Sequence, residues 1–217
     1  MRPWLALCPL LFSASAVAAQ PAAEPALPRV DVQAAIGWQN LRNREADVSR
    51  NNWMNSIVFG DAAVGWYWTE HLRMQIDVGA GSTGHGNRVV DRSAGPRAAY
   101  QLVETEVSPA TFAVSQQYQF FHNALFHPHV GAGLLVRREH VEQRYSPVTV
   151  FDPITRQSTM LEPPRIEAET RTDAAALADV GFKLYLSQRA FFSSDVRFTF
   201  RRGVDGVLLR FGFGADF

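Results

Sequence analysis

Six histidines are the side chains most able to act as a base near neutral pH: His71, His85, His122, His127, His129 and His140. A hydrolytic site needs a nucleophile beside such a base and a carboxylate that orients it. His140 is flanked by Glu139 and Glu142, but the sequence places no serine beside this group. The spacing therefore assigns no catalytic residue, and an enzyme is not expected.

Two of these histidines have a spacing that raises the question of a metal. His127 and His129 are two residues apart, so they share a face of an extended strand, and His122 lies in the neighbouring turn. Two imidazoles can bind zinc or copper, but a metal site normally has three or four ligands. The pattern favours polar residues at the end of a strand, and neither a metal nor a cofactor is predicted.

The chain opens with the features of a secretory signal peptide. A positive start at Arg2 is followed by an apolar run, residues 4–17, and by small residues before Gln20. We predict that residues 1–19 are removed. Residues 20–29 are rich in proline and alanine and are predicted to form an unstructured periplasmic lead-in.

The composition excludes several functions. Cys8 is the only cysteine and lies in the predicted signal peptide, so the mature chain has neither a disulfide framework nor thiol chemistry. Arg2 also leaves, so 21 basic and 21 acidic residues become 20 and 21, a net charge of about −1. This balance lacks the excess of basic residues that is typical of nucleic-acid-binding proteins. No later apolar stretch has the length of a transmembrane helix, so the mature chain could cross a membrane only as a closed barrel.

The end of the chain alternates strictly between two kinds of side chain. One face of a strand over 207–217 carries Val207, Leu209, Phe211, Phe213, Ala215 and Phe217. The other face carries Leu208, Arg210, Gly212, Gly214 and Asp216. Successive strand residues point to opposite faces, so one face is apolar and the other carries charge. One of these faces requires a non-aqueous solvent.

The same period of two recurs seven more times along the chain. The predicted strands cover about 30–39, 56–68, 72–81, 105–120, 129–139, 173–185, 192–201 and 207–217. The connections between them alternate in length. Those at 69–71, 121–124 and 187–189 are short, whereas those at about 41–52, 82–104 and 141–168 are long and polar. The last outer link is an exception, because the predicted turn near Gly203, Val204 and Asp205 is short. Outer-membrane barrels alternate in this way, with short periplasmic turns and long outer loops.

Aromatic residues gather beside the short turns: Trp66, Trp68, Phe120, Phe126 and Phe192. Aromatic side chains at that height are typical of a membrane interface, although ordinary strand packing is the alternative.

The polar faces of these strands carry a balanced set of five acids and five bases: Asp61, Arg73, Asp77, Arg137, Glu139, Asp179, Lys183, Asp195, Arg197 and Arg210. A small soluble barrel of the lipocalin type would turn these charges outward and fill its core with the apolar face. That face is too bulky for one small barrel, which favours lipid outside. Eight strands leave an interior that side chains can fill, so we expect paired charges that plug the lumen.

These features together resemble the small eight-stranded outer-membrane β-barrel proteins, the group that includes the membrane domain of OmpA, OmpX and OmpW. The resemblance rests on the strand pattern and on the ending Gly-Phe-Gly-Ala-Asp-Phe, residues 212–217. It implies an all-β, eight-stranded antiparallel up-and-down transmembrane β-barrel over residues 30–217, in the bacterial outer membrane. The aromatics Phe211, Phe213 and Phe217 are then the signal for the barrel-assembly machinery.

The resemblance also implies the partners and leaves the role open. Outer-membrane lipid and lipopolysaccharide would surround the barrel, and the long outer loops could carry an extracellular ligand. Members of the group serve as envelope-stabilising, adhesive or small-solute proteins. The alternatives are a narrow small-solute channel and a lipid-modifying enzyme, but no histidine here sits in the His-x-Ser arrangement of the lipid A deacylases.

Deleting Phe217 should impair assembly far more than replacing a loop residue of equal size, because Phe217 belongs to the predicted signal and the loop residue does not. The measurement is the yield of folded protein in the outer-membrane fraction. Equal yields of the two variants would contradict the signal role of Phe217.

Overall fold

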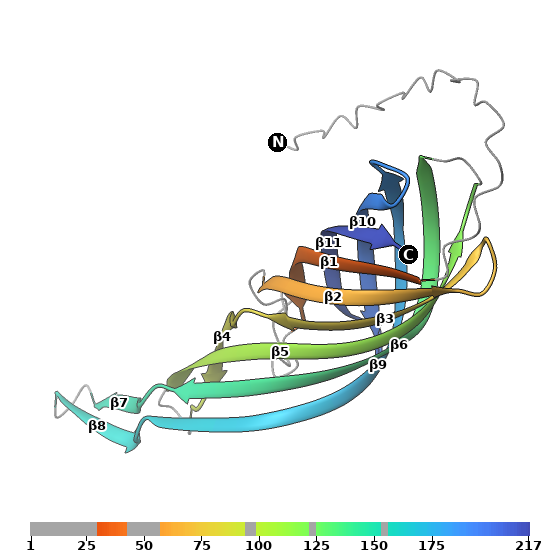
Figure 1. The fold of residues 1–217 in the computed structure, drawn as a ribbon. Helices are drawn as coiled ribbons and strands as arrows, with labels where there is room; N and C mark the ends of the chain where they lie inside the picture. Colours follow the sequence, from red (N-terminus) through yellow and green to blue (C-terminus); the bar gives the residue numbers. More distant parts are fainter. Residues whose placement is uncertain (1–29, 43–56, 94–98, 122–124, 153–155) are drawn as a thin grey trace, which may run out of the picture.

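The computed structural model describes residues 30–42, 57–93, 99–121, 125–152 and 156–217 (Figure 1). The predicted signal peptide and lead-in, residues 1–29, lie outside this part of the chain. The described residues form strands and their connections: β1 (Val30–Leu41), β2 (Ile57–Tyr67), β3 (Leu72–Gly81), β4 (Gly84–Asp91), β5 (Tyr100–Gln119), β6 (Phe126–Tyr145), β7 (Val148–Asp152), β8 (Gln157–Glu162), β9 (Arg165–Tyr185), β10 (Ala190–Phe200) and β11 (Val204–Asp216). None of the described segments is a helix able to cross a membrane.

Most of these strands join one antiparallel sheet that closes on itself. The order is β3-β2-β1-β11-β10-β9-β6-β5-β4, and β3 also pairs with β5. The strands β3 and β4 pair with successive parts of β5, the residues 110–118 and 100–107, so they occupy one position in the sheet. The barrel therefore has eight strand positions, and the predicted all-β, eight-stranded up-and-down architecture is confirmed.

The barrel is apolar on its outside and polar on its inside. Along β1, Val32 and Ile36 are 45% and 55% exposed. Asp31, whose side chain lies on the inner face of the same strand, is 0% exposed. The same alternation of exposed and buried positions follows β2, β3, β10 and β11. A water-soluble barrel would have the reverse arrangement, so the exposed apolar belt faces lipid.

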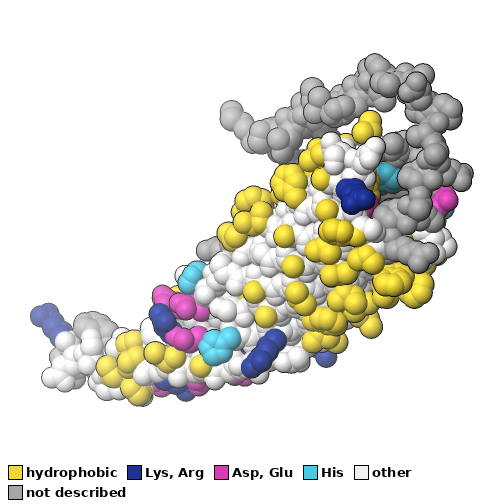
Figure 2. Space-filling view, viewed as in Figure 1, with side chains coloured by type: hydrophobic (Ala, Val, Ile, Leu, Met, Phe, Trp, Pro, Cys, Tyr) yellow, Lys and Arg dark blue, Asp and Glu magenta, His cyan; other side chains and the backbone are white. Residues whose placement is uncertain are grey.

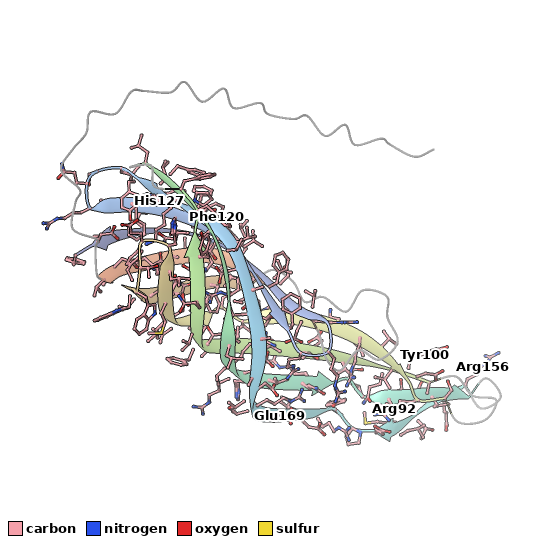
Figure 3. All side chains as sticks on the ribbon, turned by 90° about the vertical axis from the view of Figure 1, so that its right-hand side faces the viewer. Arg92, Tyr100, Phe120, His127, Arg156 and Glu169 are labelled. Carbon is pink, nitrogen blue, oxygen red and sulfur yellow. The ribbon has the colours of Figure 1, made fainter. Side chains whose placement is uncertain are left out.

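Exposed aromatic side chains mark one end of the belt. Trp66, Trp68, Phe120 and Phe126 are all at least one third exposed and lie where the short turns join the strands. Phe120 and His127 lie together at this end in Figure 3, far from the tip of the long strands. This arrangement matches the interfacial girdle that the sequence predicted.

Three strands continue well beyond the other end of the barrel. The strands β5, β6 and β9 have 20, 20 and 21 residues, and their far halves leave the barrel together with β4 (Figure 1). The hairpin of β7 and β8 completes the tip. We call this four-stranded projection and its hairpin the extension, residues 84–93, 99–108, 138–152 and 156–173.

The extension corrects the sequence prediction that residues 82–104 and 141–168 are long polar loops. Most of these residues are in β4, β5, β6, β7, β8 and β9. The pairing of β6 with β9 runs without interruption from Phe126 and Leu184 to Tyr145 and Arg165. The predicted loop at 41–52 lies almost entirely outside the described residues.

Packing inside the extension is consistent with a defined surface. Ala99, Val148 and Val150 form a buried apolar cluster at the tip. Gln101 beside it is fully buried, and its side-chain amide donates a 2.8 Å hydrogen bond to the backbone oxygen of Ser146. Buried polar groups that are satisfied in this way stabilise one arrangement over others.

Two valines of similar exposure provide a test of where the membrane lies. Val78 on β3 is 54% exposed on the belt, and Val89 on β4 is 65% exposed on the extension. We expect Val78→Arg to lower the free energy of unfolding in lipid bilayers by about 2–4 kcal/mol, because the guanidinium would enter hydrocarbon. Val89→Arg should change it by less than about 0.5 kcal/mol, because that side chain meets water.

The measurement is urea unfolding in phosphatidylcholine bilayers, with the wild-type chain as reference. Equal losses for the two variants would contradict the assignment of the belt to the membrane and the extension to water.

Candidate functional site: the charge network of the lumen

The inward face of the barrel wall combines charged side chains with glycines that make room for them. A Cβ at Gly65 would overlap Nε of Arg73, and one at Gly131 would lie 2.6 Å from Oδ1 of Asp179. These two charged side chains thus extend across a neighbouring glycine. Glycine at these two positions therefore leaves room for the charge.

One cluster lies near the C-terminal end of β11 and is centred on Asp31. Arg73 donates to both carboxylate oxygens of Asp31, and the Nε contact is 2.6 Å. Lys183 Nζ donates to the same carboxylate at 2.6 Å and to the Tyr67 hydroxyl at 2.7 Å. Lys183 also lies 4.1 Å from the centre of the Phe191 ring. Two cations therefore share one fully buried carboxylate.

A second cluster, nearer the middle of the barrel, is centred on Arg210. Its guanidinium donates to Asp195 at 2.8 and 3.1 Å, to Asp61 at 3.0 Å and to Asp77 at 2.9 Å. Arg197 also donates to Asp77, at 3.0 Å. Three carboxylates surround Arg210, and planar guanidinium groups suit such paired contacts.

Neutral side chains connect these two clusters. Gln117 accepts a 2.5 Å hydrogen bond from Arg73 and donates one of 3.1 Å to Asp179. Gln75 accepts from Arg73 and donates to Asp77. The polar chain from Asp31 to Arg210 is therefore continuous across the lumen.

A third cluster closes the opposite mouth. Arg137 pairs with Asp205 and, at 2.8 Å, with Glu139, while Arg201 pairs with Asp173 at 2.8 Å. Beyond it, an apolar group of Leu41, Ile57, Val107 and Val141 is buried against the inner face of the extension. An ionic layer and then an apolar layer therefore separate the lumen from this mouth.

The structure brings together the charges that the sequence placed on the inner face. All ten side chains point into the lumen: Asp61, Arg73, Asp77, Arg137, Glu139, Asp179, Lys183, Asp195, Arg197 and Arg210. Asp31, Asp205, Tyr67 and His129 also belong to the network but were not selected from the sequence. Asp31 and His129 show the same alternation as their neighbours, so this signal was available. Asp205 was assigned instead to a turn.

The histidines are dispersed among the described residues. His129 is buried in the lumen, with Nε2 at 3.8 Å from Asp179, so its expected place at the rim is wrong. His71 contacts the Gln119 backbone oxygen at 2.9 Å, and His140 Nδ1 lies 3.4 Å from the Thr170 hydroxyl on the exposed face. No three metal-binding side chains come together in the described part of the chain, and His122 lies outside it.

Comparisons with solved structures agree with this architecture. The N-terminal β-barrel domain of OprF from Pseudomonas aeruginosa is 12% identical, with 87% of this chain and 98% of that chain covered and a TM-score of 0.50. Neisserial surface protein A is 13% identical, with 87% and 97% covered and a TM-score of 0.52. No protein-family model matches the chain, and no curated protein does either.

The chain has the fold of the small outer-membrane β-barrels. At these identities the likeness concerns the fold, and the location follows from the surface itself. A closed barrel with an apolar belt outside and charges inside is stable only where lipid surrounds it. The protein therefore lies in the bacterial outer membrane, as the sequence predicted.

Arg210 offers the sharpest test of the network. Arg210→Leu should lower the free energy of unfolding by about 3–5 kcal/mol, because it leaves the carboxylates of Asp195, Asp61 and Asp77 without their central cation. Arg189→Leu, at an exposed turn, is the control and should change it by less than about 0.5 kcal/mol. Urea unfolding in lipid measures both, and equal effects would contradict a structural role for Arg210.

Proposed function

We propose that this chain is a non-enzymatic, non-conducting outer-membrane protein that uses its extension for envelope structure or surface interaction. The observation that carries the proposal is the contrast between a filled lumen and a packed projection beyond the membrane. The short turns lie on the periplasmic side and the extension on the outer side, in keeping with the usual orientation of such barrels.

The filled lumen supports a structural rather than a transport role. The chain of contacts from Asp31 through Arg73 and Gln117 to Asp179 crosses the interior, and Arg137 with Glu139 blocks the far mouth. An ion that entered would have to separate buried pairs, which costs several kcal/mol for each ion that loses its partner. This argues against a stable open pore.

The outer face of the extension changes character along its length. Next to the belt lies a charged zone, where Arg144 contacts Glu142 at 2.8 Å and Glu106 at 3.6 Å. The hydrogen bond to Glu142 raises the pKa of Arg144 above its ordinary value. This charged zone gathers on the extension in Figure 2, while apolar side chains cover the barrel.

Beyond the charged zone, apolar side chains return to the surface. Val89, Tyr100, Met160 and Leu161 are each more than half exposed. The tip, marked by Tyr100 and Arg156 in Figure 3, lies far from the belt, so lipid does not explain these side chains. Exposed apolar area outside the membrane is typical of protein contact sites.

The edge of β9 supports the same role. The pairing of β10 with β9 ends at Ala176, and no described strand pairs with the outer edge of residues 165–170. An exposed strand edge can accept an added strand from a partner through backbone hydrogen bonds.

The aromatic side chains at the end of the chain would meet two partners, the barrel-assembly machinery and the outer-membrane lipid. Phe213 and Phe217 are 64% and 72% exposed on the belt, and Phe211 packs edge-on against Trp38 on the neighbouring strand. These positions are accessible to the barrel-assembly machinery before lipid covers them. Outer-membrane lipid and lipopolysaccharide would then surround the belt.

The purified barrel should form no large, stable channel in planar lipid bilayers, because charged pairs fill its lumen. Single-channel recording with a known porin as the positive control measures this. Reproducible currents of porin size would contradict the non-conducting lumen and favour the small-solute alternative.

Shortening the extension should separate folding from surface function. Tyr145 and Arg165 face each other across β6 and β9, so an Asn-Gly turn can replace residues 146–164. We expect the barrel to keep heat-modifiable migration on gels, while adhesion of expressing cells to protein-coated surfaces falls to the level of cells without the protein. Loss of folding would make the hairpin structural, and unchanged adhesion would move any binding into the barrel wall.

A further inference from the structure

A groove of about 890 Å³ lies at the rim where β10 turns into β11. Its lining comes from β6, from β9, from the β10–β11 turn and from the residue that follows β1. The side chains that matter for its chemistry are Leu134, Ala176, Phe200, Val204, Arg42 and Arg202.

The groove exists because neighbouring strands end at different heights. The last pair between β9 and β10 joins Ala176 to Phe200, after which β9 continues alone toward the extension. The surface of β9 at Ala174 and Ala175 is therefore not covered by β10, and methyl side chains leave it open. The adjoining turn is tight, since Gly203 has a φ of 147°, a backbone angle that other residues rarely adopt.

One part of the groove belongs to the membrane surface. Leu134, Phe200 and Val204 are 68%, 36% and 38% exposed and continue the apolar belt. Water does not reach side chains at this height in a bilayer, so an acyl chain is the natural cover. Acyl contact alone does not select a ligand, because one lipid tail is as apolar as another.

The other part of the groove is basic. Arg201 is paired with Asp173 at 2.8 Å and lies 3.7 Å from Asp205. Arg42 and Arg202 are exposed, and neither forms an ion pair with a carboxylate of the described residues. Two such guanidinium groups at the level of lipid headgroups match the charge and the geometry of phosphate.

We propose that this groove binds a phosphorylated glycolipid of the outer leaflet, with an acyl chain along Leu134 and Phe200 and a phosphate on Arg42 and Arg202. The choice of the outer leaflet rests on the proposed function, which places the extension on the outer side of the membrane. Selectivity for a phosphorylated lipid comes from the arginine–phosphate contacts. The apolar side chains Leu134 and Phe200 set the depth at which the headgroup lies.

The test is native mass spectrometry of the folded full chain in detergent with lipid A as the probe, either bisphosphorylated or enzymatically dephosphorylated. The wild-type chain should retain the bisphosphorylated form at least about tenfold more strongly. Arg42→Gln with Arg202→Gln should remove this preference. Arg156→Gln with Arg189→Gln is the matched control, because it removes the same charge at the hairpin tip and at the opposite barrel end.

A second variant tests the apolar half. Ala176→Trp should fill the groove and weaken lipid retention at least about tenfold while both arginines remain, and heat-modifiable migration reports whether it folds. Equal retention by the two arginine double variants, or no preference for phosphate, would overturn the groove proposal. Such a result would not contradict the proposal of a non-conducting barrel. Channel currents from a chain that still retains lipid A would contradict the non-conducting barrel but not the groove proposal.

Discussion

A charge in a lumen only eight strands wide cannot remain unpaired, and the rest of the barrel depends on this constraint. Asp31 holds Arg73 and Lys183, while Arg210 holds three carboxylates from β2, β3 and β10. All of these pairs except Arg210–Asp195, which joins β10 and β11, connect strands that are not consecutive in the sequence. The network therefore fixes the register of the wall as well as filling it, and it leaves the apolar side chains no place but outside.

The same strands meet two solvents along their length. On β5 and β6, Phe112 and Val136 face lipid, but a few residues farther on Glu106 and His140 occupy the same face. The change marks the membrane boundary within continuous strands. It lets the barrel act as a rigid base, so that contacts at the tip of the extension are held at a defined distance from the membrane.

The barrel could be predicted because lipid on one face and charge on the other impose a strict period of two, as in residues 207–217. The strands of the extension could not be predicted from the sequence, because water reaches the outer face of the extension and its inner face is only partly apolar. In β9, Glu167, Glu169 and Arg171 lie on one face opposite Gln143, Val141 and Glu139 of β6. This face is therefore not apolar, and its strand structure follows from pairing with β6. The alternation also places Asp31 on the inner face, but one carboxylate on a strand does not reveal that two cations converge on it.

If lipid covers the belt and water covers the extension, equally exposed residues in the two regions should meet different solvents. Ile36 on β1 and Leu161 on β8 are both 55% exposed. A single cysteine with a spin label at each position, in the mature chain reconstituted in bilayers, reports collisions with oxygen and with a water-soluble nickel complex. Oxygen access should be strong and nickel access weak at Ile36, and the reverse should hold at Leu161. Equal nickel access at both positions would contradict this expectation.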